Sequence, residues 1–124
     1  MIRGVGIDLI EVDRVAVKIG KEMGFREWVF SKNEINYCEG KANKFEHYAA
    51  RFAAKEAFFK AIGTGWAKDT AFNEIEITNN HEGKPEISFL GKTAASMAEM
   101  KLGKMSVSLS HLKTMASAIV IIEN

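Results

Sequence analysis

The sequence is poor in cysteine and in histidine. Cys38 is its single cysteine, which excludes an internal disulfide and leaves too few thiols for a zinc cage. This usage suits a reducing compartment. Isolated cysteines often pack as small hydrophobic residues, so we expect Cys38 to be a half-buried helix residue. With three histidines, the chain also offers few ligands for zinc or copper.

Long apolar runs and a strong excess of one charge are also absent. An arginine, two glycines and an aspartate among residues 1–8 exclude the apolar core of a signal peptide. No stretch approaches the roughly 18 apolar residues of a membrane span. The formal charge of +1 gives no strong field that would attract nucleic acid or an anionic membrane. We therefore expect a soluble, cytoplasmic protein without nucleic-acid or membrane partners.

The order of the predicted elements indicates one α+β domain. With 124 residues, 47% of them hydrophobic, the chain is typical of a single compact domain, and we assign residues 1–124 to it. The pattern predicts a mainly antiparallel sheet packed against a long, alanine-rich helix. Strands are expected at 2–10, 73–78, 85–90, 105–111 and 116–122, and helices at 13–23, 32–38, 45–62 and 92–101.

Several local signals support particular elements. The helix at 45–62 contains no proline or glycine and ends before Gly63. Ser31 and Glu34 have the spacing of a capping box at the start of a helix. Asp13 or a neighbour is expected to cap the first helix, and Gly24 to close it. The run 116–122 is apolar on both faces, which is typical of a strand in the centre of a sheet.

Asp8 is unusual for its predicted strand. It lies between Ile7 and Leu9, where a buried carboxylate without a partner would carry a large desolvation cost. Strand alternation places Gly4, Gly6 and Asp8 on one face, so the carboxylate faces a groove that the glycines leave empty. We expect something to occupy this groove, although a helix cap or a structural ion pair would also explain Asp8.

Glu56 is the second unusual acid, because it lies in the middle of the alanine-rich helix. Phe52 and Lys60 are one turn away on either side, so one helix face presents an acid beside a base. A solvated Glu56–Lys60 pair worth about 0.3 kcal/mol is the simplest explanation. The surrounding alanines also let another backbone or a ligand lie close to this helix.

Asp8 and Glu56 together are suited to a hard cation. Mg²⁺ usually takes one or two carboxylates, with waters and substrate phosphates as its other ligands. Lys60 and Arg51 would add positive charge nearby. The expected ligand is therefore a phosphate ester, whose charge the metal and the cationic side chains neutralise as a bond breaks.

His111 ends a predicted strand. Serines of the segment 106–110 share one strand face, which leaves His111 on the other face with Val107 and Leu109. A histidine in this place can reach a ligand or serve a structural role. His47 and His81 lie in polar surroundings and are predicted to be surface residues.

The first helix carries a basic stripe. Arg14, Lys18 and Lys21 are spaced i, i+4 and i+7, which places them on one side while Val15 and Ile19 point elsewhere. An ordinary solvated helix face would have this pattern, and so would a docking surface for an acidic helical partner.

Three segments together resemble the holo-acyl-carrier-protein synthase family of 4′-phosphopantetheinyl transferases. They are GVGIDLIE at 4–11, RFAAKEAFFKAIGTG at 51–65 and SLSH at 108–111. The match covers essentially the whole chain in order and length, and the first two segments form a highly specific pair. The resemblance implies the 4′-phosphopantetheinyl transferase fold and a homotrimer with active sites at its subunit interfaces.

The resemblance also implies roles for individual residues. Asp8 and Glu56 would bind Mg²⁺ together with the pyrophosphate of coenzyme A, and Lys60 would contact the phosphate. Arg51 and His111 would contact the nucleotide phosphates. Coenzyme A binding is further expected at Gly63 and Gly65. Arg14 matches a family contact to acidic carrier-protein helices, and the basic stripe extends this docking surface to Lys18 and Lys21.

The implied reaction transfers 4′-phosphopantetheine from coenzyme A to a serine of apo acyl carrier protein, in support of fatty acid biosynthesis. The serine hydroxyl attacks the β-phosphate in line, and adenosine 3′,5′-bisphosphate leaves. Asp8, Glu56 and Lys60 are the expected catalytic residues, with Glu56 or a water that it holds removing the serine proton. A non-catalytic coenzyme A or carrier-protein module, and an α+β interaction subunit without ligands, are the alternatives.

Overall fold

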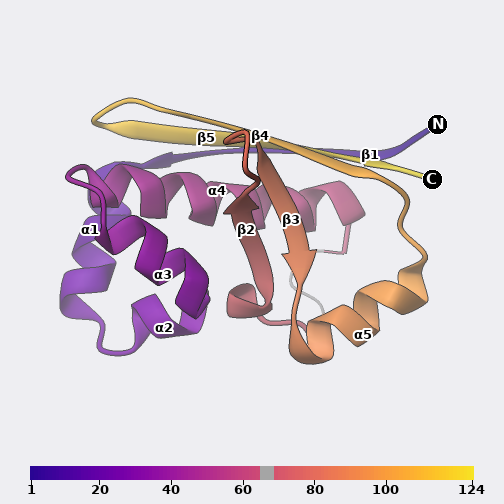
Figure 1. The fold of residues 1–124 in the computed structure, drawn as a ribbon, viewed down its shortest axis with the longest axis horizontal. Helices are drawn as coiled ribbons and strands as arrows, with labels where there is room; N and C mark the ends of the chain where they lie inside the picture. Colours follow the sequence, from indigo (N-terminus) through magenta and orange to yellow (C-terminus); the bar gives the residue numbers. More distant parts are fainter. Residues whose placement is uncertain (65–68) are drawn as a thin grey trace.

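Helix α4 (Lys44–Ile62) lies in the middle of the computed structural model, which describes residues 1–64 and 69–124 (Figure 1). One side of α4 is covered by a three-stranded antiparallel sheet in the order β1-β5-β4. Its strands are β1 (Ile2–Glu11), β4 (Met105–His111) and β5 (Met115–Glu123). The predicted central position of the last strand is therefore confirmed, as is the packing of an antiparallel sheet on the alanine-rich helix.

The other described elements lie on the opposite side of α4 from this sheet (Figure 1). They are the helices α1 (Val12–Lys21), α2 (Phe25–Val29), α3 (Lys32–Glu39) and α5 (Gly91–Met100), a 3₁₀ turn η1 (Phe72–Glu74), and the antiparallel hairpin β2 (Ile75–Asn79) with β3 (Pro85–Phe89). The hairpin forms a sheet of its own, so the structure has two antiparallel sheets where one was expected. No helix within the described residues is both long enough and apolar enough to cross a membrane.

The end of the first helix differs from its prediction. Helix α1 stops at Lys21, and Gly24, with φ 84°, precedes a further helix α2 that was not predicted. A five-residue helix is too short to show a clear hydrophobic period, which explains the omission. The residue before α1 is Glu11, which makes no side-chain capping bond, so the predicted Asp13 cap is wrong.

Other local predictions are confirmed. Ser31 and Glu34 form a reciprocal capping box: the Glu34 amide donates to Ser31 Oγ (3.2 Å) and the Ser31 amide donates to Glu34 Oε1 (2.9 Å). Helix α4 ends at Gly63, whose left-handed φ of 79° stops the helix. Cys38 lies in α3 but is completely buried rather than half-buried, and burial raises the pKa of its thiol to about 12.

An ion pair inside the core anchors α4 on the side away from the sheet. Lys55 Nζ donates to Glu34 Oε1 (2.6 Å) and to the backbone carbonyls of Val29 (2.7 Å) and Phe72 (2.8 Å). Both charged side chains are fully buried. Glu34 also accepts a hydrogen bond from the amide of Ile77 (2.9 Å). Removing one partner of such a pair costs about 3–5 kcal/mol, so the network joins α4, α3, η1 and β2 firmly.

Strand β1 and helix α4 touch backbone to backbone. A Cβ atom on Gly6 would overlap the carbonyl oxygen of Ala57, and one on Gly4 would overlap that of Ala61. Both alanines are buried, and their small side chains permit this approach. The groove expected beside Asp8 is therefore filled by α4 itself, which confirms that another backbone lies close to the alanine-rich helix.

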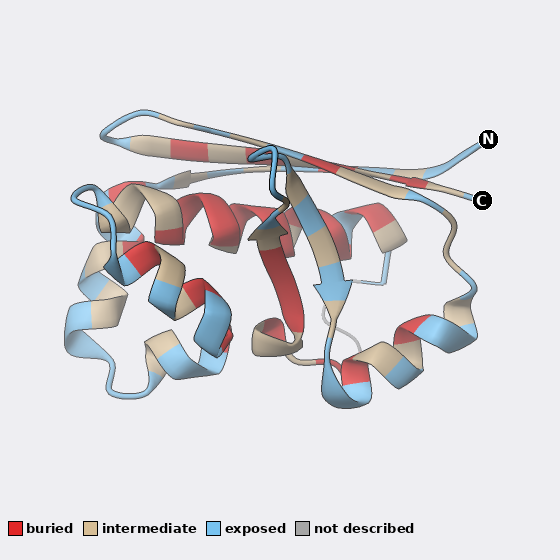
Figure 2. Ribbon diagram, in the orientation of Figure 1, coloured by how far each residue is buried: buried red, intermediate tan, exposed pale blue. Residues whose placement is uncertain are grey.

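The outer face of the β1-β5-β4 sheet is not covered by any other described element (Figure 2). Ile2, Val5, Ile7 and Leu9 on β1 are each between 53% and 64% exposed. An apolar row of this size on an isolated chain is typical of an interface with another protein.

Gly6→Ala tests the close contact between β1 and α4. The added methyl group forces the two backbones apart, so we expect a loss of about 2–3 kcal/mol in the free energy of unfolding. Gly20→Ala is the matched control, because nothing lies near its Cβ position in helix α1. The control is expected to be neutral or stabilising by up to about 1 kcal/mol. Denaturant titration measures both, and equal stability of Gly6→Ala and the unchanged chain would contradict the contact.

Candidate active site

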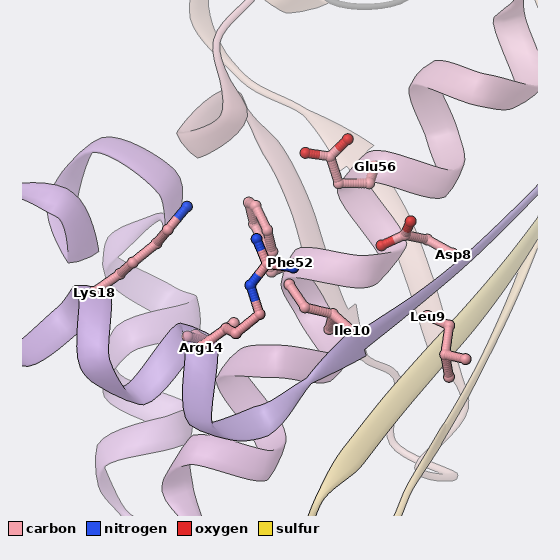
Figure 3. Close-up of a pocket in the computed structure, with 8 residues that line it drawn as sticks. Asp8, Leu9, Ile10, Arg14, Lys18, Phe52 and Glu56 are labelled. Atoms are coloured by element: carbon pink, nitrogen blue, oxygen red, sulfur yellow. The ribbon is translucent and has the colours of Figure 1, made fainter.

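The contact between β1 and α4 brings Asp8 and Glu56 to one cavity (Figure 3). The cavity has a volume of about 270 Å³. Its floor and walls come from β1, α1 and α4, and it is lined by Asp8, Leu9, Ile10, Arg14, Val15, Lys18, Phe52 and Glu56. Two acids 48 positions apart in the sequence thus face the same space, as predicted.

The two carboxylates repel each other. Partial burial raises the pKa of Glu56, and the negative charge of Asp8 raises it further. The positive charges of Lys60 and Lys18 act in the opposite direction. A bound cation would relieve the repulsion between the two acids, which makes this the part of the structure best suited to a metal ion.

Lys60 forms its ion pair with Asp8, although its positive charge also acts on Glu56. Its ammonium group donates to Asp8 Oδ1 (3.0 Å) and to the backbone carbonyl of Ile7 (3.0 Å). The direct Glu56–Lys60 ion pair, which was the simplest alternative for Glu56, does not form, whereas the structural ion pair considered for Asp8 is present. The Lys60 side chain remains 55% exposed, so it can also reach a ligand in the solvent.

The donor set fits Mg²⁺ better than zinc or copper. No three His, Cys, Asp or Glu side chains meet within residues 1–64 and 69–124, so those residues alone cannot form a closed metal cage. Mg²⁺ needs only one or two carboxylates when substrate phosphates and waters provide its other ligands. Asp8 and Glu56 satisfy this requirement.

Part of the basic stripe reaches the same cavity. Arg14 and Lys18 line it from α1 and point toward the acids, whereas Lys21 is not among its lining residues (Figure 3). On the same helix, Val15 is buried and Ile19 is partly buried. The Lys18 ammonium lies 5.7 Å from the centre of the Phe25 ring.

Arg51 lies in a second cavity. The sequence had suggested that it would lie near Lys60 and the two acids, which is wrong. This cavity of about 230 Å³ is lined by Tyr37, His47, Ala50, Arg51, Asn79, Gly83, Pro85, Ser108, Leu109 and His111. Arg51 is only 2% exposed, and its guanidinium carbon lies 4.3 Å from the centre of the Tyr37 ring. Its Nε has no hydrogen-bond partner among the described residues. A buried cation without a counter-ion is costly, so this cavity is suited to an anion.

His111 reaches the same cavity from the end of β4. Its Nδ1 lies 2.8 Å from Glu46 Oε1, so this nitrogen carries the proton that the carboxylate accepts. His47 is not a simple surface residue, because it is half-buried and packs against both Tyr37 and His111. His81 is exposed in the β2–β3 turn, as predicted.

The structure describes only one of the two glycines that are expected to bind coenzyme A. Gly63 is exposed at the end of α4, next to the helix turn that carries Lys60. Gly65 lies outside the described residues. Coenzyme A binding at both stays a prediction.

Comparison with known proteins gives a consistent result. Residues 4–117 match the family described as the 4′-phosphopantetheinyl transferase superfamily. The chain belongs to this superfamily. It is 48% identical to the holo-[acyl-carrier-protein] synthase of Cytophaga hutchinsonii, over 98% of this chain and 97% of that protein. The holo-[acyl-carrier-protein] synthase of Solibacter usitatus is 42% identical over the full length of both chains.

Solved structures of this superfamily have the same fold. The holo-[acyl-carrier-protein] synthase from Neisseria meningitidis aligns over 100% of both chains with a TM-score of 0.90 and 29% identity. The enzyme from Bacillus anthracis, solved in complex with CoA (3′,5′-ADP), aligns over 98% of this chain and 96% of that chain. Its TM-score is 0.80 and its identity 36%. The resemblance and the fold class expected from the sequence motifs are therefore confirmed.

The places of two residues were not predicted from the sequence: Lys55, which belongs to a quoted motif, and His47, which lines the second cavity. Lys55 belongs to the quoted motif, yet its position inside the core depends on Glu34, which lies 21 residues earlier. His47 was overlooked because its polar neighbours in the sequence suggested solvent. The histidine lies four positions before Arg51, one helix turn away, and this spacing was the available signal.

Glu56→Gln is expected to raise thermal stability in the absence of metal. Because the pKa of Glu56 is raised in the folded chain, ionising this acid costs folding free energy as the pH rises through that pKa. Glutamine removes the cost, so the melting temperature should increase at pH 7.5, and the gain should shrink toward zero near pH 4. Glu82→Gln, in an exposed turn, is the control. A lower melting temperature for Glu56→Gln at pH 7.5, with chelator present, would contradict the repulsion.

Proposed function

We propose that this chain is a Mg²⁺-dependent holo-[acyl-carrier-protein] synthase. It transfers the 4′-phosphopantetheine of coenzyme A to a serine of apo acyl carrier protein and releases adenosine 3′,5′-bisphosphate. The full-length similarity to the synthase of Cytophaga hutchinsonii supports this reaction. The meeting of Asp8 and Glu56 at one cavity, with Lys60 bonded to Asp8, supports it most directly, because a phosphoryl-type transfer needs charge neutralisation and little else from the protein.

In this proposal, Asp8 and Glu56 hold Mg²⁺, which when bound neutralises charge on the phosphate oxygens. Glu56, whose pKa is raised, or a water that it orients, accepts the proton of the attacking serine hydroxyl. The exposed ammonium group of Lys60 turns from Asp8 toward the phosphate and offsets the developing negative charge. No side chain of this chain becomes covalently modified.

Arg51 and His111 contact the nucleotide phosphates. The guanidinium group of Arg51 is buried without a counter-ion among the described residues, and a phosphate in the cavity would supply one. His111 already donates from Nδ1 to Glu46, which leaves Nε2 available to a ligand.

The active site forms between subunits of a homotrimer. Neither the Asp8 cavity nor the Arg51 cavity, at about 270 and 230 Å³, reaches the roughly 300–1,000 Å³ of typical ligand sites, and coenzyme A is a large ligand. The uncovered apolar row on β1 belongs to the strand that carries Asp8. Packing of copies against this face would bring the Asp8 cavity of one subunit to the Arg51 cavity of the next.

The acidic carrier protein docks on the basic stripe of α1. Arg14 and Lys18 lie between the helix surface and the metal-binding acids, so a carrier bound there would hold its serine near the reaction centre. Lys21 extends the same side of the helix. A reaction of this kind belongs in the cytoplasm, where we expect the protein to act.

The intact mass of an apo acyl carrier protein tests the reaction. Incubation with this chain, coenzyme A and Mg²⁺ should add about 340 Da, the mass of one phosphopantetheine. Glu56→Gln should lower the initial rate by at least about 100-fold, since it removes a metal ligand and the proton acceptor. Glu82→Gln should keep the wild-type rate.

Chelator and added metal complete this test. Excess chelator should stop the mass gain, and Mg²⁺ should restore it. An unchanged carrier mass, despite measurable coenzyme A binding, would favour a non-catalytic binding module instead. Absence of both coenzyme A and metal binding would leave only an α+β interaction subunit.

Mixing two inactive variants tests the shared site. Asp8→Asn disables one cavity, and Arg51→Met disables the other while its unbranched chain keeps the packing against Tyr37. If each active site combines the two cavities from different subunits, an equal mixture of the two variants regains about a quarter of wild-type activity by random assortment. Light scattering confirms assembly. Trimers that mix and stay inactive would place both cavities of each site in one subunit, and a stable, active monomer would contradict sharing altogether.

A further inference from the structure

The cavity around Arg51 contains a cluster of three rings, of which the proposed phosphate contacts use only His111. The His47 ring packs edge-on against Tyr37, with ring centres 5.6 Å apart, and against His111, with ring centres 5.1 Å apart. All three side chains line the cavity. They come from α4, α3 and β4 respectively, so only the folded chain brings them together.

His47 has no polar partner in the described part of the chain. No hydrogen bond or ion pair joins its ring nitrogens to another described residue, whereas Nδ1 of His111 is paired with Glu46. Edge-on contacts with Tyr37 and His111 hold the His47 ring in place without using its nitrogens. Its nitrogens therefore remain available to a ligand in the cavity.

The charges around His47 oppose its protonation when the cavity holds no anion. Burial lowers the pKa of His47 most, followed by the positive charges of His111 on β4, Arg51 on α4 and Lys41 between α3 and α4. Glu46 acts in the opposite direction, but its carboxylate is paired with His111. Tyr37, from α3, is the other titratable group that packs against the ring.

We infer that His47 is a proton-dependent contact of the nucleotide-phosphate site, neutral in the free protein and charged when a phosphate group occupies the cavity. This inference rests on the function proposed above. Without a ligand, the positive charges around His47 disfavour its charged form. A negatively charged phosphate beside Arg51 and His111 would favour that form instead. His47 thereby adds a positive charge to the site only when the ligand is present.

Thermodynamic linkage gives this inference a measurable consequence. If phosphate binding favours the charged form of His47, then binding takes up a proton, and protonation favours binding by the same factor. Ligand affinity therefore rises as the pH falls through the His47 pKa of the complex. It stops rising below the lower pKa of the free protein.

Calorimetric titration with adenosine 3′,5′-bisphosphate and with coenzyme A tests the coupling. Titrations at pH 6, 7 and 8, each in buffers of different ionisation enthalpy, give the number of protons taken up. His47→Phe keeps an aromatic ring between Tyr37 and His111 and removes the ionisable nitrogens. We expect the variant to take up fewer protons, and to bind about five- to tenfold more weakly than wild type at pH 6 but within about twofold at pH 8.

Protonation of the phosphate occurs in both proteins, so it cancels in the comparison. His81→Phe, in the exposed turn, is the control and should match wild type throughout. Equal proton uptake by His47→Phe and wild type would overturn the inference, as would a loss of affinity by the same factor at all three pH values. Failure of wild type to bind either ligand at any pH would overturn the proposed function as well.

Discussion

The backbone contact between β1 and α4 determines where the candidate active site forms. The residues of this contact lie close to the site in sequence: Ala57 follows Glu56, Ala61 follows Lys60, and Gly6 lies two positions before Asp8. A side chain larger than hydrogen at Gly4 or Gly6 would separate the strand from the helix. The distance between the two carboxylates, and with it their suitability for one metal ion, therefore depends on the absence of two Cβ atoms.

The opposite side of α4 is held by a different interaction. Lys55 faces the core and is fully buried against Glu34, while Glu56, the next residue, faces the cavity. Since consecutive helix residues point about 100° apart, the buried pair sets the rotation of α4 and thus the direction of Glu56. The helix that supplies the reactive side chains is in this way positioned by a satisfied charge pair on its other face.

Two of the site residues, in contrast, carry charges that the described part of the chain does not satisfy. Glu56 faces Asp8, and Arg51 is buried on Tyr37 without a counter-ion among the described residues. These arrangements lower stability, but a cation in one cavity and a phosphate in the other would each remove the cost. Glu56 and Arg51 thus carry unsatisfied charge where the proposed ligands bind, whereas the buried charges of Lys55 and Glu34, on the other side of α4, are paired with each other.

The sequence by itself determined the features that depend on near neighbours. The long helix, its end at Gly63, the capping box of Ser31 with Glu34, and the two unusual acids could all be identified from residues within a few positions of one another. Only the tertiary structure decided which distant residues meet. The separate β2–β3 sheet, the pairing of Lys60 with Asp8, and the placement of Arg51 with His47 and His111 in a second cavity join residues through packing. Local hydrophobic patterns specify which face of an element is buried, but they contain no information about which element covers it.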